Sequence, residues 1–282
     1  MAIKEVEILE TSESVIKAYN DRPKTLVRNI IAFAVIGTLL VWSSAILDFG
    51  GINEQGINVI KGVMNALIKP NKEWLFSLDA NSTSIPFLMF ETVAMAFLGT
   101  IVGAVLAIPF AFLASRNITG DLGSYGGSLI VTVIRTFPVL ILGLMFIKVA
   151  GPGPFAGVLT ISISSIGMIT KLYIESIEDI DKGILDALDA TGATTIQKIR
   201  YGIIPQLSAN FISVAIYRFE INVRNATILG LVGAGGIGFT LIAAMGAYRW
   251  TDAAACLWGI VVVVLAVEFF STKIRHKLIT GE

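Results

Sequence analysis

The chain has 282 residues, of which 55% are hydrophobic and 15% are charged, and its mean hydropathy is +0.78. Soluble domains carry about 25% charged residues, so this composition excludes an ordinary soluble globule. Lysine plus arginine and aspartate plus glutamate both number 21, so no basic excess points to nucleic acid. The single cysteine, Cys256, excludes an internal disulfide and a multi-cysteine metal site, and we expect no bound metal.

The polar N-terminal segment, residues 1–28, is the first element of the chain. Residues 3–20 alternate charged side chains with apolar ones. Two interpretations stay open for this pattern, namely a helix lying along a membrane surface and a solvated tail.

A membrane-spanning helix needs about 20 mostly apolar residues, and six stretches of the chain meet this requirement. None of them alternates with period two, which favours helices over barrel strands. In chain order they are residues 29–47, 92–115, 122–147, 149–170, 206–226 and 253–272. The sequence therefore predicts an all-α membrane protein with about six transmembrane helices in a lipid bilayer.

Basic residues next to the first and last spans predict the orientation of the protein. Lys24 and Arg28 precede the first span, and Lys273, Arg275 and Lys277 follow the last. Both termini are therefore expected in the cytoplasm, in a multi-pass protein of the cell membrane. The segment 48–84 is then extracellular, with a surface helix around 55–68, and residues 276–282 form a cytoplasmic tail.

Residues 230–238 read GLVGAGGIG, and three of these glycines fit the GxGxxG spacing of a dinucleotide loop. Such a loop needs a preceding strand and a whole βαβ unit, whereas a charged membrane helix precedes this one. We prefer a bent or re-entrant element that lines a translocation path, with Gly233, Gly235 and Gly236 as candidate lining residues. A tight extracellular turn is the alternative.

Ionisable residues inside membrane spans are costly, so they usually face the interior of a bundle or a cavity. One predicted span contains Arg218, Glu220 and Arg224. Glu220 and Arg224 are four residues apart and can pair on a helix, which leaves Arg218 as a surplus positive charge.

Arg135 is a second surplus charge, three residues before Pro138. Glu91 and Glu268 are either counter-charges or residues at the membrane interface. A net positive lining suits an anionic solute, so Arg135, Arg218, Glu220 and Arg224 are candidate path or gate residues. The alternative is that these charges only pair with one another and hold the bundle together.

The polar segment 171–205 lies on the cytoplasmic side in this topology. It predicts two short helices with apolar faces, contributed by Ile184, Leu185, Leu188, Ile196 and Ile199. Gly192 between them ends the first helix. A helix-turn-helix at the membrane surface suggests docking into the groove of a soluble partner.

Within this segment, DALDATGATTIQKIRYGIIP resembles the coupling loop of ABC importer permeases, whose pattern is EAA, three residues, Gly, nine residues, then I-x-L-P. Four positions depart from the pattern: Asp186 replaces Glu, Leu188 the second Ala, Gly202 the Ile and Ile204 the Leu. The resemblance implies a coupling loop over 175–205, with ATPase-coupling residues Asp186, Ala187, Leu188, Gly192, Ala193 and Pro205.

Three further stretches resemble the phosphonate-type members of this permease family, and the resemblance covers residues 85–275. They are ETVAMAFLGTIVGAVLAIPFAFLASRN, VIRTFPVLILGLMF and YRFEINVRNATILGLVGAGGIG. The resemblance implies the type I ABC importer permease fold. It also implies import of a phosphonate or related phosphorus oxyanion, delivered by a substrate-binding protein.

The same resemblance implies a second permease copy, with a homodimer expected, and an ABC ATPase subunit that uses the ATP. This chain would itself bind no cofactor and catalyse no reaction, and it contains no GxxxxGK[ST] phosphate-binding loop.

Two other classes of protein are alternatives. An ion-driven secondary transporter of a small anion could use Glu91 and Glu268 as proton sites, although no inverted repeat is detectable. A membrane-embedded enzyme would need converging catalytic groups, and the sequence contains neither HExxH nor GxSxG.

Overall fold

The structure is a computed structural model that describes residues 25–46, 54–77 and 84–280. Every regular element in these ranges is a helix. The chain forms two compact units, residues 1–59 and 60–282. Residues 3–20, for which a surface helix and a solvated tail are both open, lie outside the described residues.

The first unit contains helix α2, Thr25–Ile46, which includes the first predicted span. Its described side chains are almost all exposed, and large apolar groups such as Phe33, Leu40 and Trp42 point outward around it. A helix that is hydrophobic all round requires lipid or protein on every side.

Helix α3, Glu54–Ile68, confirms the helix expected around residues 55–68. Helix α4, Lys72–Phe76, follows it, and the Asn71 side chain caps α4 by accepting a hydrogen bond from the Trp74 N–H. The Asn71 amide also donates to Asp252 Oδ1 at 2.9 Å, and the Trp258 indole donates to the Leu67 carbonyl at 3.0 Å. These bonds fix α4 and the end of α3 against the last helix of the chain.

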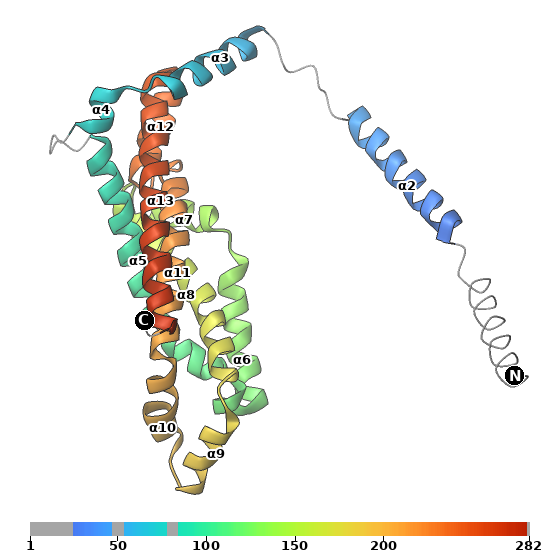
Figure 1. Cartoon of the computed structure of the whole chain (residues 1–282), viewed down its shortest axis with the longest axis vertical. Coiled ribbons are helices and arrows are strands. Elements are labelled where there is room, and N and C mark those ends of the chain that lie inside the picture. Colours follow the sequence, from blue (N-terminus) through green and yellow to red (C-terminus); the bar gives the residue numbers. More distant parts are fainter. Residues whose placement is uncertain (1–24, 47–53, 78–83, 281–282) are drawn as a thin grey trace, which may run out of the picture. The chain divides into compact units, whose positions relative to one another are not determined.

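The remaining helices form one bundle (Figure 1). In chain order they are α5 Ile85–Ala114, α6 Arg116–Thr136, α7 Val139–Ala150, α8 Pro154–Glu178, α9 Lys182–Ala190, α10 Thr195–Lys198, the π-helix η2 Ile199–Ile203, α11 Ile204–Gly230, α12 Ile237–Gly246 and α13 Trp250–Thr280. Helices α9 and α10 project from one end of the bundle, which we call the α9–α10 end, and α12 lies toward the opposite end (Figure 1).

Helices α5 and α8 form the centre of the bundle and approach each other closely through small residues. A Cβ on Gly99 would lie 2.6 Å from Ile161, and one on Gly103 would lie 2.6 Å from Ser165. Only glycine permits this approach, because any side chain would push the two backbones apart.

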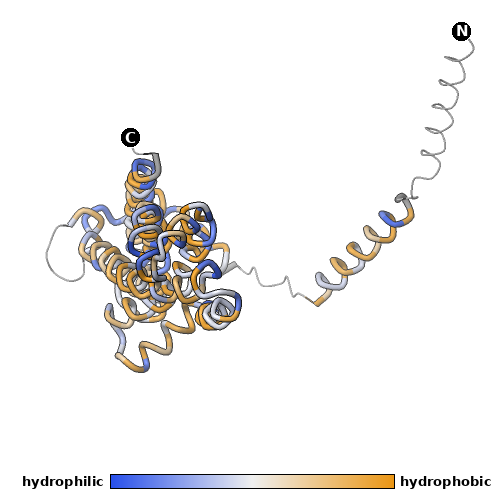
Figure 2. Tube along the Cα trace, turned by 90° about the horizontal axis from the view of Figure 1, so that it is seen from below, coloured by the Kyte–Doolittle hydropathy of each residue, from blue (hydrophilic) through white to orange (hydrophobic). Residues whose placement is uncertain are grey.

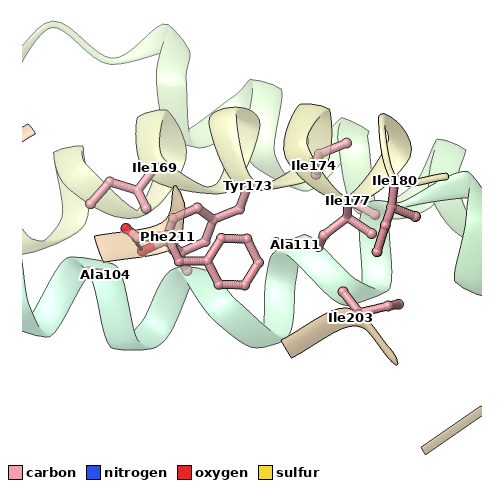
Figure 3. Packing of buried hydrophobic residues seen from close by; sticks show 11 residues of the cluster. Ala104, Ala111, Ile169, Tyr173, Ile174, Ile177, Ile180, Ile203 and Phe211 are labelled. Carbon is pink, nitrogen blue, oxygen red and sulfur yellow. Dashed lines mark hydrogen bonds between the residues drawn. The ribbon is translucent and has the colours of Figure 1, made fainter. Parts of the chain in front are cut away.

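A buried apolar cluster joins α5, α8 and α11 near the α9–α10 end (Figure 3). The rings of Tyr173 and Phe211 lie 4.3 Å apart, and the Tyr173 hydroxyl donates to the Phe211 carbonyl at 3.2 Å. The buried phenol therefore contributes packing area and satisfies its own hydrogen-bonding need.

Four described helices, α2, α5, α8 and α13, are long and apolar enough to cross a membrane, and α6 with α7 makes a fifth if that bent pair counts as one. The two members of the pair meet at 81°, at the break made by Phe137 and Pro138. Helix α11 has 27 residues but carries the three charges noted above. The predicted spans thus correspond to α2, α5, α6–α7, α8, α11 and α13.

Several bounds differ from the sequence expectation: α5 begins at Ile85 and not at residue 92, and the predicted span 122–147 is two helices, α6 and α7. The fourth span begins at Pro154 and not at residue 149, because Gly151 and Gly153 have positive φ and interrupt the helix. Helix α13 continues to Thr280, so most of the segment expected as a tail is helical. Hydrophobic residues cover much of the helices of this bundle (Figure 2), as expected for helices in lipid.

Candidate functional site

The buried carboxylate of Glu220 organises a network of four charges between α11 and α13. Arg224 contacts Glu220 at 2.9 Å and Glu268 at 3.0 Å, and Arg275 contacts Glu220 at 3.5 Å. The predicted pairing of Glu220 with Arg224 is therefore confirmed, whereas Glu268 is a counter-charge to Arg224 and not to the surplus Arg135 or Arg218. Two acids and two bases give the network no net charge.

Arg275 is the member of this network that the sequence analysis missed. It was assigned to the basic flank of the last span, yet its guanidinium also lies 5.3 Å from the centre of the Tyr217 ring. Its spacing of seven residues from Glu268 places both on one face of α13, which is the signal that could have identified it.

Arg218 has a different environment, although it lies only two residues before Glu220. It is 4% exposed, and no carboxylate in the described part of the chain is within ion-pair distance of it. Its partners are two hydroxyls of α8, Ser164 at 3.1 Å and Ser165 at 3.5 Å. The surplus positive charge expected on α11 is thus present in the structure.

Asn222 extends this polar cluster one turn further along α11. Its amide nitrogen donates to Thr100 at 2.8 Å and Ser165 at 2.7 Å, whereas its buried Oδ1 has no partner among the described residues. A buried charge and an unsatisfied carbonyl are costly in a membrane bundle, so a cluster of this kind is typical of functional positions.

Arg135 lies in the last turn of α6, outside both of these groups. Its Cγ packs so closely over Gly167 of α8 that a Cβ at that position would lie 2.7 Å away. It makes no ion pair with any residue that the structure describes, and it lines a cavity between α6 and α8. The structure therefore does not unite Arg135 with Arg218 and Arg224.

The glycine stretch separates α11 from α12, as a bent or re-entrant element requires. Gly233, Gly235 and Gly236 have φ of 96°, 85° and 71°, which side chains rarely adopt. At ten residues, α12 is about 15 Å long, half of the roughly 30 Å of a bilayer core.

Glu91 and Thr92 of α5 hold this turn in place. The Glu91 carboxylate accepts the Gly236 N–H at 2.9 Å, and the Thr92 hydroxyl accepts the Ile237 N–H at 3.0 Å. The turn also meets the start of α8, where the Gly153 N–H donates to the Gly233 carbonyl at 3.0 Å. Glu91 is thus a cap on the positive end of α12, a role that neither sequence interpretation of this residue included.

The predicted helix-turn-helix of residues 171–205 is confirmed. Asp181 caps α9, and Gly192 follows that helix with φ of 74°. Thr194 and Gln197 form a capping box at α10, and Pro205 lies in the first turn of α11. Each break in the segment is therefore made by local chemistry that the sequence contains.

Two residues that depart from the coupling-loop pattern contact each other. The Leu188 Cδ1 lies where a side chain on Gly202 would begin, 2.6 Å from an ideal Cβ. The family pattern has a small residue at the first position and a large one at the second. The chain exchanges their sizes and keeps the contact filled.

The outer surface of this tip is exposed. Asp186 and Ala187 are exposed, and Ile196 is 76% exposed, while Ile199 packs against the buried cluster of the bundle. A protruding tip with an uncovered isoleucine can insert into a partner's groove.

Residues 107–276 match the family described as "Binding-protein-dependent transport system inner membrane component". A phosphite transport system permease protein from Stutzerimonas stutzeri is 36% identical over 188 residues, which cover 66% of this chain and 68% of that protein. A putative cryptic phosphonate transport system permease protein from Escherichia coli K12 is 40% identical over 121 residues, which cover 43% and 99%.

The fold also resembles a solved structure. A chain of the MetNI methionine ABC transporter in an inward-facing conformation superposes with a TM-score of 0.59 at 24% identity, over 67% of this chain and 94% of that one. At this identity the likeness concerns the fold alone. The predicted all-α importer permease fold is confirmed.

Proposed function

The chain belongs to the family of binding-protein-dependent transport system inner membrane components, and we propose that the cargo it moves is a phosphonate or a closely related phosphorus oxyanion. Membership makes it a multi-pass membrane permease of an ABC importer, which works with a separate ATPase and a substrate-binding protein. This assignment replaces the alternatives of an ion-driven transporter and a membrane enzyme.

The observation that carries the proposal of an anionic cargo is the buried Arg218, which has no ionic partner among the residues that the structure describes. An arginine with only hydroxyl partners keeps guanidinium donors and a full positive charge inside the bundle. A tetrahedral oxyanion would supply the missing negative charge. Two relatives whose names specify phosphite and phosphonate transport support this class of cargo.

The proposed path uses both groups of residues on α11. Arg218 would contact the anion, and Arg224 with Glu220 would gate its passage through the network shared with α13. The turn containing Gly233, Gly235 and Gly236 would form the outer part of the path. Its hydrogen bonds to α5 and α8 are few enough to break and re-form when the transporter changes state.

A second copy of the chain is the proposed membrane partner. The side chains of Arg224 and Glu268 are 44% and 51% exposed in the single chain. Charges in a membrane helix face protein or water, so a homodimer around an aqueous path would cover them.

The basic residues next to the first and last spans further support the proposal that both termini lie in the cytoplasm.

The tip of α9 and α10 is the proposed docking site for the ATPase, with Asp186, Ala187, Leu188, Gly192, Ala193 and Pro205 shaping it. We propose that nucleotide binds only to that partner and that this chain holds no cofactor. ATP binding would then move α9, and through Leu188 and Gly202 the start of α11.

The test is ATP hydrolysis by the chain reconstituted in lipid with its cognate ATPase. The cognate binding protein would be added empty, loaded with a phosphonate, or loaded with phosphate. Stimulation by the phosphonate-loaded form is the expected result. Equal stimulation by all loaded forms would assign selectivity to the binding protein, and the absence of any association with the ATPase would contradict the proposal.

A further inference from the structure

A cavity of about 550 Å³ lies between α6 and α8 toward the α9–α10 end of the bundle, and neither charge group of α11 contributes to it. Its lining contains three basic side chains, two acidic ones and four hydroxyl groups. The basic residues are Arg116, Arg135 and Lys171. This composition is unlike the apolar grooves elsewhere on the bundle.

Two of the three cations have no ionic partner in the described part of the chain. Lys171 pairs with Glu175 at 3.1 Å, and the carboxylate of Glu178 accepts the backbone N–H of Arg116 at 2.9 Å. Within the described ranges, no carboxylate lies within 4.0 Å of the guanidinium of Arg116 or of Arg135. Three basic and two acidic side chains leave the lining with one positive charge in excess, and no described carboxylate pairs with the guanidinium of Arg116 or Arg135.

The position of Arg135 is built into the packing of α6 on α8. Its stem occupies the space left by Gly167, and a methyl group there would displace it. Ser128 and Thr132 precede Arg135 by seven and three residues, so all three share one face of α6. The Thr132 hydroxyl donates to its own helix, whereas that of Ser128 makes no hydrogen bond among the described residues and can donate to a ligand.

We propose that this cavity binds a phosphorus oxyanion through Arg116 and Arg135. Planar guanidinium groups donate paired hydrogen bonds to tetrahedral oxyanions, and hydroxyl donors such as Ser128 complete such a site. The identification of the bound oxyanion as the transported cargo rests on the proposed function. The same chemistry would also accept the phosphate of an anionic lipid, and the experiment separates the two sources.

The experiment measures thiol modification of a Ser128→Cys variant in the complete transporter, held in nanodiscs of zwitterionic lipid. The native Cys256 is buried, so the unsubstituted chain serves as the blank. We expect an anionic methanethiosulfonate to react about fourfold faster than a cationic one, because the charge of Arg135, about 10 Å away along α6, attracts the first and repels the second. Methylphosphonate or inorganic phosphate should slow the reaction.

The variant Arg135→Gln should remove both the preference and the protection, and Arg135→Lys should retain part of each. Arg28→Gln on α2 is the matched control and should change neither. Protection that appears only when phosphatidylglycerol is added would identify the occupant as a lipid phosphate. Equal rates for both reagents, with no protection by any of the anions, would overturn the site.

The ATPase assay on the same nanodiscs separates this inference from the proposed function. Stimulation by the loaded binding protein together with an unprotected Ser128→Cys would remove the site and leave the importer assignment intact. If anions protect the Ser128→Cys thiol but the loaded binding protein does not stimulate ATP hydrolysis, the anion site is present and the proposed cargo is wrong.

Discussion

Arg218 and Glu220 lie two residues apart on α11, yet Arg218 pairs with no carboxylate of the described ranges, whereas Glu220 is held by two arginines. We predict that Arg218→Gln lowers uptake by about tenfold or more, since a buried ion pair with the cargo contributes about 2–5 kcal/mol. The melting temperature should stay equal or rise, because an unpaired buried charge has been removed. Uptake assays in proteoliposomes and thermal unfolding would show these opposite effects. Unchanged uptake would remove Arg218 from the path.

Removing the charge of Glu220 is expected to lower the stability of the protein, in contrast to removing that of Arg218. Glu220 is 7% exposed, and Glu220→Gln leaves Arg224 and Arg275 without their shared carboxylate. We predict a loss of about 1–3 kcal/mol of unfolding free energy, because Arg275 loses its carboxylate while the partly exposed Arg224 keeps Glu268. Glu268→Gln is the matched control and should cost much less, because half of that side chain is exposed. Equal melting temperatures for the two variants would show that burial does not govern this network.

At the scale of elements, the contact between α9 and η2 makes a prediction about residue size. Gly202→Ile places a branched side chain against Leu188 and should cost about 1–3 kcal/mol through overpacking. Adding Leu188→Ala should recover a large part of that loss, since the pair then has the sizes of the family pattern. Melting temperatures of the two single variants and the double variant form the cycle. Strictly additive losses would mean that the residues do not share one space.

The glycine turn depends on a second contact between elements. A Cβ on Gly238 would overlap the carbonyl oxygen of Thr227 and lie 2.9 Å from the Gly230 Cα, so Gly238→Ala must separate α12 from α11. We predict that this variant loses stability and uptake together. Gly246→Ala is the control, because nothing lies within 4 Å of its Cβ and alanine favours the helix. Measured uptake equal to wild type in Gly238→Ala would show that the turn tolerates separation.

At the scale of the whole molecule, the basic residues that flank the spans predict which side of the bilayer each loop occupies. We expect a membrane-impermeant thiol reagent on intact cells to label Lys61→Cys in α3 and to leave Ile196→Cys unlabelled until the cells are opened. Both positions are exposed, and Cys256 is buried and serves as the internal control. The reverse labelling pattern would invert the topology and place α9 and α10 outside the cell.

The sequence by itself determined the features that depend on local spacing. The apolar runs predict the helices because crossing a bilayer requires length and hydrophobicity, which are properties of one segment. The pairing of Glu220 with Arg224 follows from a spacing of four residues, and the end of α9 follows from the backbone freedom of Gly192.

The tertiary structure alone decided which helices meet and which faces they share. Glu91 caps α12 from 145 residues away, and Arg224 reaches Glu268 across 44 residues. Helices that are apolar on nearly every side carry no strong periodic signal for their rotation about their own axes. Their rotation is fixed by close packing at glycines such as Gly103 and Gly167, whose partners become visible only when the helices are assembled.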